Sequence, residues 1–276
     1  MKKLLAVLLA VAMIFAFAAC TNEPAEPDTS ATDAQEEIPV DGMLINANCT
    51  EEEFVEYLAK KDANRGVIFY NDLNTMLLAL QAGEISSIVS IPEAVADYII
   101  ARNPGITKNV SSFGAVVSYQ MAVKQENTDL LDSLNEAIGT LYDNGTMEQL
   151  VADYIDAYTT GTEDPEAVEI PVIEGADTIK VAVTGDVPPM DLVTADGKAA
   201  GFNVALLAEM SKLMNVNFEL VPMNTAARAL SIASDKVDAI FWIIENSDNP
   251  GIDLPDTLAA TRPYYSGARC VLKLAE

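Results

Sequence analysis

The sequence predicts an α/β fold with a mainly parallel sheet, and three observations support this prediction. Apolar, strand-like runs alternate with helical segments along most of the chain. Helix start and stop signals lie between the segments. The 276 residues, of which 50% are hydrophobic, suffice for one large domain or two smaller ones that each bury a core. Strands that alternate with helices form a parallel sheet with helices on both faces.

The start of the chain has the pattern of an exported lipoprotein. Residues 1–19 carry two lysines and then the apolar run LLAVLLAVAMIFAFAA, as a secretory signal peptide does. Cys20 follows, and FAAC resembles the lipobox of bacterial lipoproteins, with Phe17 where leucine is usual. A transmembrane helix is disfavoured because the run is short and no basic stop follows it. We expect lipidation of Cys20 to anchor the protein to a membrane outside the cytoplasm.

The composition argues against several functional classes. The chain has 16 Lys and Arg residues against 42 Asp and Glu residues, a formal charge of −26. We expect no nucleic-acid partner, because phosphate repels such a surface. The chain has no His and three Cys, which disfavours a metal site or a catalytic triad, so we expect no cofactor. Besides Cys20, Cys49 and Cys270 are either paired or free.

The first elements follow an acidic tether, residues 20–41, which has too few apolar side chains to form a core. A buried strand is predicted over 43–47. Thr50 is the predicted N-cap of the next helix, with Glu53 three residues further on.

Two strand–helix pairs come next. The first helix has Asn71 or Asp72 as its cap and is stopped by Gly83. The second helix has Pro92 in its first turn and ends in another stop signal. The strands that precede these helices are predicted at residues 66–70 and 85–91.

The second half of the chain begins with a long apolar strand at 113–123. A helix pair broken at Gly145 follows and ends at residue 158. Residues 159–177 are rich in acid, Pro and Gly and predict a linker. The stretch 178–242 then reads as one βαβα unit. It is followed by the loop TRPYYSGA and a last strand, RCVLKLA.

The stretches VAVTGDVPPMDLV, DGKAAGFNVALLAEMSKLM, KVDAIFW and TRPYYSG together resemble the first lobe of extracellular solute-binding protein family 3, the amino-acid-type periplasmic binding proteins. DGMLINANCTEEEFVEYL and the segment around ISSIVSIPEAVADYI resemble its second lobe. The resemblance implies a two-lobed, type II periplasmic-binding-protein-like α/β fold with its chain order rotated. The lobe assignments are 42–112 for the second lobe, 113–158 for the hinge strand and closing helices of the first, and 178–276 for the rest of the first.

The rotated order has two explanations. A circular permutation would join the family's old ends through residues 159–177. A damaged tandem, the tail of one binding protein followed by the head of another, would give the same order. We favour the permutation because the two halves complement each other. We then expect one covalent crossing between the lobes, around residues 112–123, and an anchor attached to the second lobe.

The resemblance also suggests where a ligand would bind. Met190 takes the place of the family's stacking aromatic, and Thr50 keeps an anion-facing hydroxyl at a helix N-terminus. The second-lobe Asp that takes an α-amine falls near Ser90 or Ile91, with Glu93 close in sequence. The Arg of the carboxylate clamp would fall in ENSDNPG, where no Arg occurs. An ordinary α-amino acid is therefore a doubtful ligand.

Other side chains are candidates to replace the missing clamp. Trp242 and Tyr264 offer apolar or stacking surfaces, and Arg228 or Arg262 offers a cation. For Trp242 a place in the core is as consistent with the sequence as a place in the cleft. The polar candidates at the end of the strand that contains Trp242 are Glu245 and Asn246.

The favoured function is a monomeric, lipid-anchored receptor that captures a small polar ligand, amino-acid-like or another organic acid, for an ABC-type permease. One alternative is a sensor or adhesion module that has lost transport. Another is an enzyme like the cyclohexadienyl dehydratases related to this fold, with Glu245 as the acid or base. No nucleophile–base pair is readable, so we expect no enzymatic activity.

Overall fold

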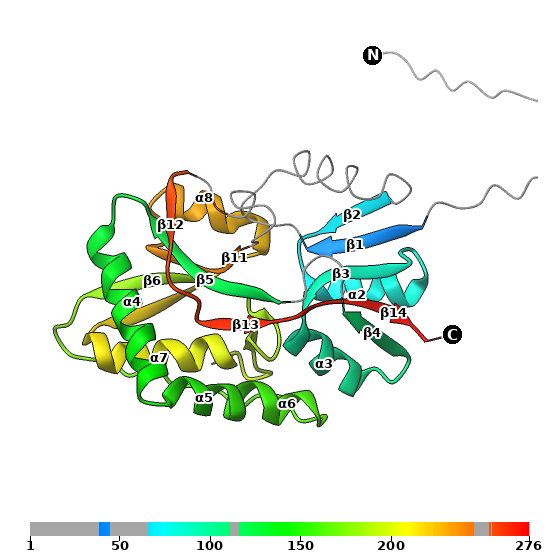
Figure 1. Cartoon of the computed structure of the whole chain (residues 1–276), viewed down its shortest axis with the longest axis horizontal. Coiled ribbons are helices and arrows are strands. Elements are labelled where there is room, and N and C mark those ends of the chain that lie inside the picture. The colour runs from blue at the N-terminus through cyan, green and yellow to red at the C-terminus, as the bar shows by residue number, and fades with distance from the viewer. Residues whose placement is uncertain (1–38, 45–65, 111–115, 246–253, 255, 276) are drawn as a thin grey trace, which may run out of the picture. The chain divides into compact units, whose positions relative to one another are not determined.

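A computed structural model describes residues 39–44, 66–110, 116–245, 254 and 256–275 (Figure 1). The predicted α/β class is confirmed, because these residues form two larger sheets and one small one, with helices packed against them. Of the helices within these ranges, none is long and apolar enough to cross a membrane.

The first sheet has the strand order β2-β1-β3-β14-β4, and β14 runs antiparallel to both of its neighbours. Helices α2 and α3 contact this sheet. We call this group of elements lobe 2. Its strands are β1 (Val40–Leu44), β2 (Gly66–Tyr70), β3 (Ser87–Pro92), β4 (Ile106–Val110) and β14 (Arg269–Leu274), and its helices are α2 (Leu73–Ala82) and α3 (Glu93–Arg102).

The second sheet has the order β10-β6-β11-β5-β12, and β13 pairs with β5 beyond the end of β12. With its helices and the small sheet β7-β8-β9 it forms lobe 1. The larger sheet contains β5 (Val117–Lys124), β6 (Thr178–Val183), β10 (Asn217–Pro222), β11 (Ala239–Glu245), β12 (Leu258–Ala260) and β13 (Tyr265–Gly267). The small sheet contains β7 (Asp186–Val187), β8 (Asp191–Val193) and β9 (Ala199–Ala200).

The helices of lobe 1 come from two parts of the chain. Before the linker lie α4 (Thr128–Asp143), α5 (Thr146–Val151), the π-helix η1 (Ala152–Asp156) and α6 (Ala157–Thr159). After it lie α7 (Phe202–Met214), the short 3-10 helix η2 (Thr225–Ala227) and α8 (Arg228–Ala233).

The two larger sheets share one plan, and each is completed by a strand from the other half. In lobe 2 the strands β2, β1 and β3 are parallel, and the antiparallel strand β14 separates β3 from β4. In lobe 1 the strands β10, β6 and β11 are parallel, and the antiparallel strand β5 separates β11 from β12. The chain therefore crosses twice, after residue 110 and again between β13 and β14.

These crossings differ from two sequence-based expectations. The last strand, assigned with 178–276 to lobe 1, lies in the sheet of lobe 2, where Cys270 pairs with Ile91 on one side and Val110 on the other. A second crossing is therefore present where only one was expected. The mostly apolar run RCVLKLA was sufficient to predict a strand. It did not indicate which sheet the strand joins, because the partner strands lie far away in the sequence.

Local signals explain most element boundaries. Asp72 caps α2 by accepting a hydrogen bond from the backbone N–H of Thr75 at 2.8 Å, and Gly83 ends the helix in the left-handed region at φ 75°. The strand expected at 43–47 begins earlier, at Val40, inside the expected tether. Asp41 of this strand is buried, and its carboxylate accepts a hydrogen bond from Ser87 Oγ on β3.

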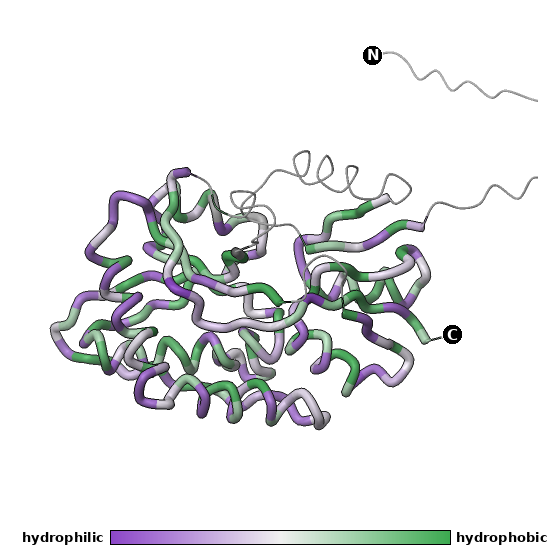
Figure 2. Tube along the Cα trace, viewed as in Figure 1, coloured by the Kyte–Doolittle hydropathy of each residue, from purple (hydrophilic) through white to green (hydrophobic). Residues whose placement is uncertain are grey.

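The main core lies between the sheets and their helices (Figure 2). Helix α7 is buried on nearly all sides, since nine of its residues, Phe202 to Ala208 together with Met210 and Ser211, are shielded from solvent. The aromatic part of the core includes Phe202, Phe241 and Tyr264, whose rings meet edge-on or stacked at centroid distances of 5.2 to 6.3 Å. This rigid centre holds the carboxyl ends of β6 and β11 in place.

Candidate functional site

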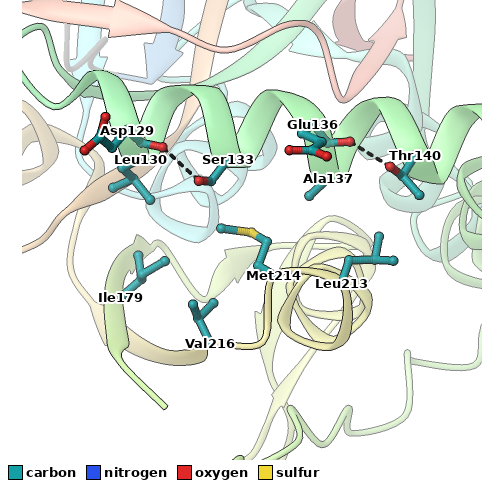
Figure 3. Close-up of a pocket in the computed structure, with 10 residues that line it drawn as sticks. All are labelled: Asp129, Leu130, Ser133, Glu136, Ala137, Thr140, Ile179, Leu213, Met214 and Val216. Carbon is teal, nitrogen blue, oxygen red and sulfur yellow. Dashed lines mark hydrogen bonds between the residues drawn. The ribbon is translucent and has the colours of Figure 1, made fainter.

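Two surface grooves of about 440 Å³ each lie within lobe 1 and contain none of the predicted site residues. The first runs between α4 and the end of α7, where apolar side chains such as Met214 face the helix (Figure 3). Its hydroxyls are already used within α4, because Ser133 donates to the carbonyl of Asp129 and Thr140 to that of Glu136. The second lies between α5, α7 and residues 167–169.

The carboxyl ends of the parallel strands offer a better candidate, since ligands of open α/β sheets bind there. Strand β6 of lobe 1 leads to Asp186, and strand β2 of lobe 2 leads to α2. The backbone N–H of Leu73, in the first turn of α2, donates to Asp186 Oδ2 at 3.3 Å. The strand ends of the two lobes therefore face each other directly. Burial raises the pKa of Asp186, and the Leu73 hydrogen bond opposes that shift.

Asp191 is the polar centre of the lobe 1 side. Only 1% of its surface is exposed, and four donors surround its carboxylate. Oδ1 accepts from Thr184 Oγ1 at 2.5 Å and from the N–H of Gly185 at 2.6 Å. Oδ2 accepts from Asn203 Nδ2 at 3.2 Å and from Trp242 Nε1 at 2.9 Å. This carboxylate therefore ties together β6, β8, α7 and β11.

Trp242, a predicted stacking surface, is held in place by that network. It lies at a β-bulge in β11, where the register with β5 shifts and its φ is 70°. Its ring meets Tyr119 edge-on at a centroid distance of 5.7 Å and is 8% exposed. Of the two sequence interpretations, the buried one is therefore correct for most of the ring.

Ser90 occupies the matching place in lobe 2. It lies in β3, the third parallel strand of its sheet, next to a register shift against β14, and its φ is 64°. For a non-glycine residue such a backbone is strained and is typical of functional sites. The third parallel strand of each sheet, β3 or β11, thus carries one residue with a strained backbone in its interior, and both residues were predicted site residues.

Glu93 begins α3 directly after β3, and its N–H donates to the carbonyl of Ala268 at 2.9 Å. Its carboxylate pairs with Lys108 at 3.0 Å, and Lys108 also contacts Asp97 at 2.6 Å. Glu93 is therefore neutralised within lobe 2, beside the second crossing. Burial first, and then the charge of Glu93, raises the pKa of Tyr265 on β13 to about 12.

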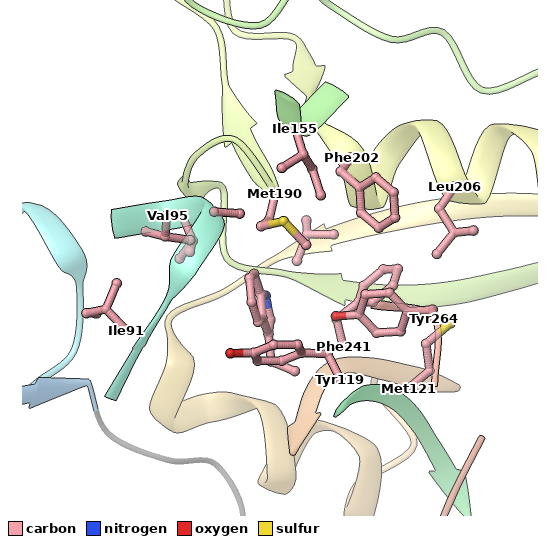
Figure 4. Close-up of a cluster of buried hydrophobic side chains, with 14 of the residues drawn as sticks. Ile91, Val95, Tyr119, Met121, Ile155, Met190, Phe202, Leu206, Phe241 and Tyr264 are labelled. Atoms are coloured by element: carbon pink, nitrogen blue, oxygen red, sulfur yellow. The ribbon is translucent and has the colours of Figure 1, made fainter. Parts of the chain in front are cut away.

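Two predicted ligand contacts lie elsewhere. Met190 is fully buried and packs among the aromatic side chains of lobe 1 (Figure 4), so it offers no surface to a ligand. The sequence placed it by position, but its side chain lies in the core. Arg262 is exposed and lies against α4, where its N–H donates to Asn135 Oδ1 at 2.6 Å. It cannot act as the cation at these strand ends.

Arg228 is the cation of this region. It starts α8, is 4% exposed, and donates to the carbonyls of Phe241 at 2.8 Å and Thr225 at 3.3 Å. Burial lowers its pKa to about 10, and the negative charge of Asp191 opposes the shift. The hydrogen bond from Arg228 to Phe241 therefore holds the backbone next to the β11 bulge, and the positive charge of Arg228 offsets the negative charge of the buried Asp191.

Several predicted residues cannot be placed. Thr50, Asn246, Cys20 and Cys49 lie outside the described residues, and for Glu245 only the backbone, at the end of β11, is described. Within the described ranges no group of three or more Cys, Asp or Glu side chains is arranged to hold a metal ion. Cys270 is buried and free in β14.

The sequence analysis missed Asp191, Thr184 and Asn203. A signal was present, because Asp191 follows an apolar Pro-Pro-Met turn and is then surrounded by apolar residues. An acidic residue in such a place must find donors. Its partner Trp242 is 51 residues away, and no local pattern connects the two residues, so their pairing could not be predicted.

The topology defines a two-lobed α/β fold in which the strand ends of the two lobes are turned toward each other. Residues 179–273 match the family Bacterial extracellular solute-binding proteins, family 3, which confirms the predicted resemblance over that range. No curated protein matches the chain.

Among solved structures, full-length CbnR with its target DNA is 12% identical at a TM-score of 0.42, over 86% of this chain and 64% of that one. A sulfate-bound OxyR2 regulatory domain from Vibrio vulnificus is 9% identical at 0.43, over 86% and 87%. NikA from Staphylococcus aureus with Ni(L-His)2 is 13% identical at 0.44, over 76% and 57%. The chain thus spans less than two thirds of CbnR and NikA, and such low scores give no ground for transferring their activities.

Proposed function

We propose that the protein is an extracytoplasmic solute-binding protein that captures a small polar ligand, amino-acid-like or another organic acid, between its lobes. The observation that carries this proposal is the Leu73–Asp186 hydrogen bond, because it brings the strand ends of the two lobes together. The family match over residues 179–273 supports the same function. Delivery to an ABC-type permease and anchoring through a lipid on Cys20 belong to the proposal.

The buried carboxylate of lobe 1, Asp191, does not serve as the binding partner of a ligand ammonium. Asp191 already accepts four hydrogen bonds, so it has little capacity left for a ligand ammonium. Glu93 is paired with Lys108 on the other side. By the family resemblance, the position of the amine-binding acid falls at about Ser90 or Ile91, and of these two residues only Ser90 offers a polar group, a hydroxyl.

Thermal unfolding in the presence of single amino acids and organic acids tests the binding function. A ligand at 100 times its Kd should add about 2.7 kcal/mol to the free energy of unfolding and raise Tm. Trp242, the only Trp of the chain, supplies a second readout through its fluorescence. A library without any shift up to millimolar concentration would contradict the proposal.

Membrane anchoring has its own test. The native protein expressed in a bacterial host should fractionate with membranes and incorporate labelled fatty acid, whereas Cys20→Ser should do neither. Cys270→Ser, at the buried cysteine of β14, is the matched control and should leave the anchor intact. Equal fractionation of the native protein and Cys20→Ser would remove the lipid anchor from the proposal.

The rotated chain order is also a proposal, and the strand register supplies a test for it. Lys273 of β14 and Thr107 of β4 are antiparallel partners and both are exposed. If one chain forms both lobes, Lys273→Cys combined with Thr107→Cys should form a disulfide within a monomer. A disulfide only between two chains would favour the tandem explanation, and Lys273→Cys alone is the control.

A further inference from the structure

The segment 157–168, which we call the strap, comprises α6 and the start of the predicted linker. It leaves lobe 1 at the end of η1, passes α3 of lobe 2 and returns to lobe 1 at β9 (Figure 1). The sequence predicts a spacer here, but the strap is bound at several points. Its contacts therefore add a connection between the lobes besides the two covalent crossings.

The contacts with lobe 2 centre on two side chains of α3. Tyr98 donates its hydroxyl to Asp164 Oδ1, and Arg102 pairs with the same carboxylate at 3.4 Å. Arg102 also donates to the carbonyls of Glu163 and, at 3.2 Å, Tyr158. Its guanidinium lies 3.4 Å above the centre of the Tyr98 ring, a cation–π contact. Tyr98 and Arg102 thus bind the strap to α3 at several points.

The strap then returns to lobe 1. Ala167 forms a β-bridge with Ala200, and the N–H of Val168 donates to the carbonyl of Ala199 at 2.9 Å. Strand β9 pairs with β8, which begins at Asp191. The strap therefore links α3 of lobe 2 to the hairpin that carries the polar centre of lobe 1.

We propose that the strap is a latch that holds the lobes together before a ligand binds. The proposal rests on the proposed function, in which the lobes move apart to admit a ligand. Such a motion must break the Arg102 and Tyr98 contacts, because α3 belongs to one lobe and β9 to the other. Asp164 is 71% exposed, so the latch is reversible and weakened by salt. Its strength sets the share of open molecules that a ligand can enter.

Distance measurements between spin labels test the latch without any ligand. The labels are attached at Leu78→Cys on α2 and Leu230→Cys on α8, which are 66% and 73% exposed and lie in different lobes. The test variant combines Arg102→Met with Asp164→Asn, and Tyr98→Phe is a milder second variant. The control combines Lys198→Met with Asp196→Asn, which removes an exposed ion pair within lobe 1.

The test variant loses the Arg102–Asp164 ion pair and the Arg102 hydrogen bonds to the strap, all of them weak surface contacts, so the open-to-closed ratio should rise roughly three- to tenfold. Added salt should have the same effect on the native protein and little on the variant. Identical distance distributions in native protein, test variant and Tyr98→Phe would overturn the latch, as would an equal change in the control. Because no ligand is used, a failure of ligand binding cannot produce either result.

Discussion

Removing the carboxylate of Asp191 should destabilise the protein more than any exposed acidic substitution. In Asp191→Ala four donors lose their acceptor: Thr184 Oγ1, the N–H of Gly185, Asn203 Nδ2 and Trp242 Nε1. Hydrogen bonds to a charged group contribute about 1.5–3 kcal/mol each, but losses within one network do not add. Breaking a buried charge network typically costs about 3–5 kcal/mol, and we expect a loss in that range.

Urea unfolding at pH 7 measures this loss, followed by far-UV circular dichroism and by the fluorescence of Trp242. The emission should shift in the folded state of Asp191→Ala, because the indole N–H loses its partner. Asp191→Asn keeps one oxygen acceptor, so its free energy of unfolding should lie between those of Asp191→Ala and the native protein. Asp196→Ala, at a side chain that is 62% exposed, is the control and should leave the stability almost unchanged.

The reasoning fails if Asp191→Ala unfolds within about 1 kcal/mol of the native protein. That result would mean that water or a shifted backbone satisfies the four donors at little cost. The fluorescence is an independent check of this explanation. An unchanged emission would show that the indole N–H of Trp242 keeps a polar partner in Asp191→Ala.

Three further predictions concern single buried groups. Burial raises the pKa of Asp186 above 3.8, so the contribution of this carboxyl to the free energy of unfolding is most favourable below that pH and is lost as the pH rises through the pKa of the folded state. Urea unfolding should therefore find Asp186→Asn more stable than the native protein at pH 7 and equally stable near pH 3. A difference in stability that stays constant with pH would contradict this. In Gly201→Ala a Cβ would lie 2.6 Å from a backbone oxygen at φ 99°, so thermal unfolding should show a loss of about 2 kcal/mol or more, whereas Gly105→Ala, with open space, should change little. Tyr119→Phe removes a buried hydroxyl without a hydrogen bond and should be neutral or stabilising, whereas Tyr142→Phe breaks a 3.1 Å bond and should cost about 1 kcal/mol in urea unfolding; the reverse order would be incompatible with these contacts.

The sequence was sufficient for the elements with local causes. Asp72 and Gly83 mark the ends of α2 because a cap and a left-handed stop act within one helical turn. Strand β4 was missed because its three central residues, 107–109, are all polar, so ITKNV lacks the apolar alternation that indicates a strand. The sheet that β14 joins could not be predicted, since its partners lie far away in sequence.

The site was predicted less well, and the reasons are physical. Ser90 and Trp242 were chosen by position, and both lie at register shifts within their strands and have a strained backbone. Met190 was chosen in the same way, yet burial decides its role, and the sequence carries no direct measure of the burial of one side chain. Asp191 was overlooked because its importance comes from partners in three other segments of the chain, the end of β6, α7 and β11.

The exchanged strands also bear on how the protein folds while it is being synthesised. Strand β4 pairs with no strand of the described chain except β14, so the sheet of lobe 2 stays split until the last of these strands has been translated. Until then β3 presents an open edge that other chains could join. The risk of such wrong pairing should grow with the time between the synthesis of residue 110 and that of residue 274.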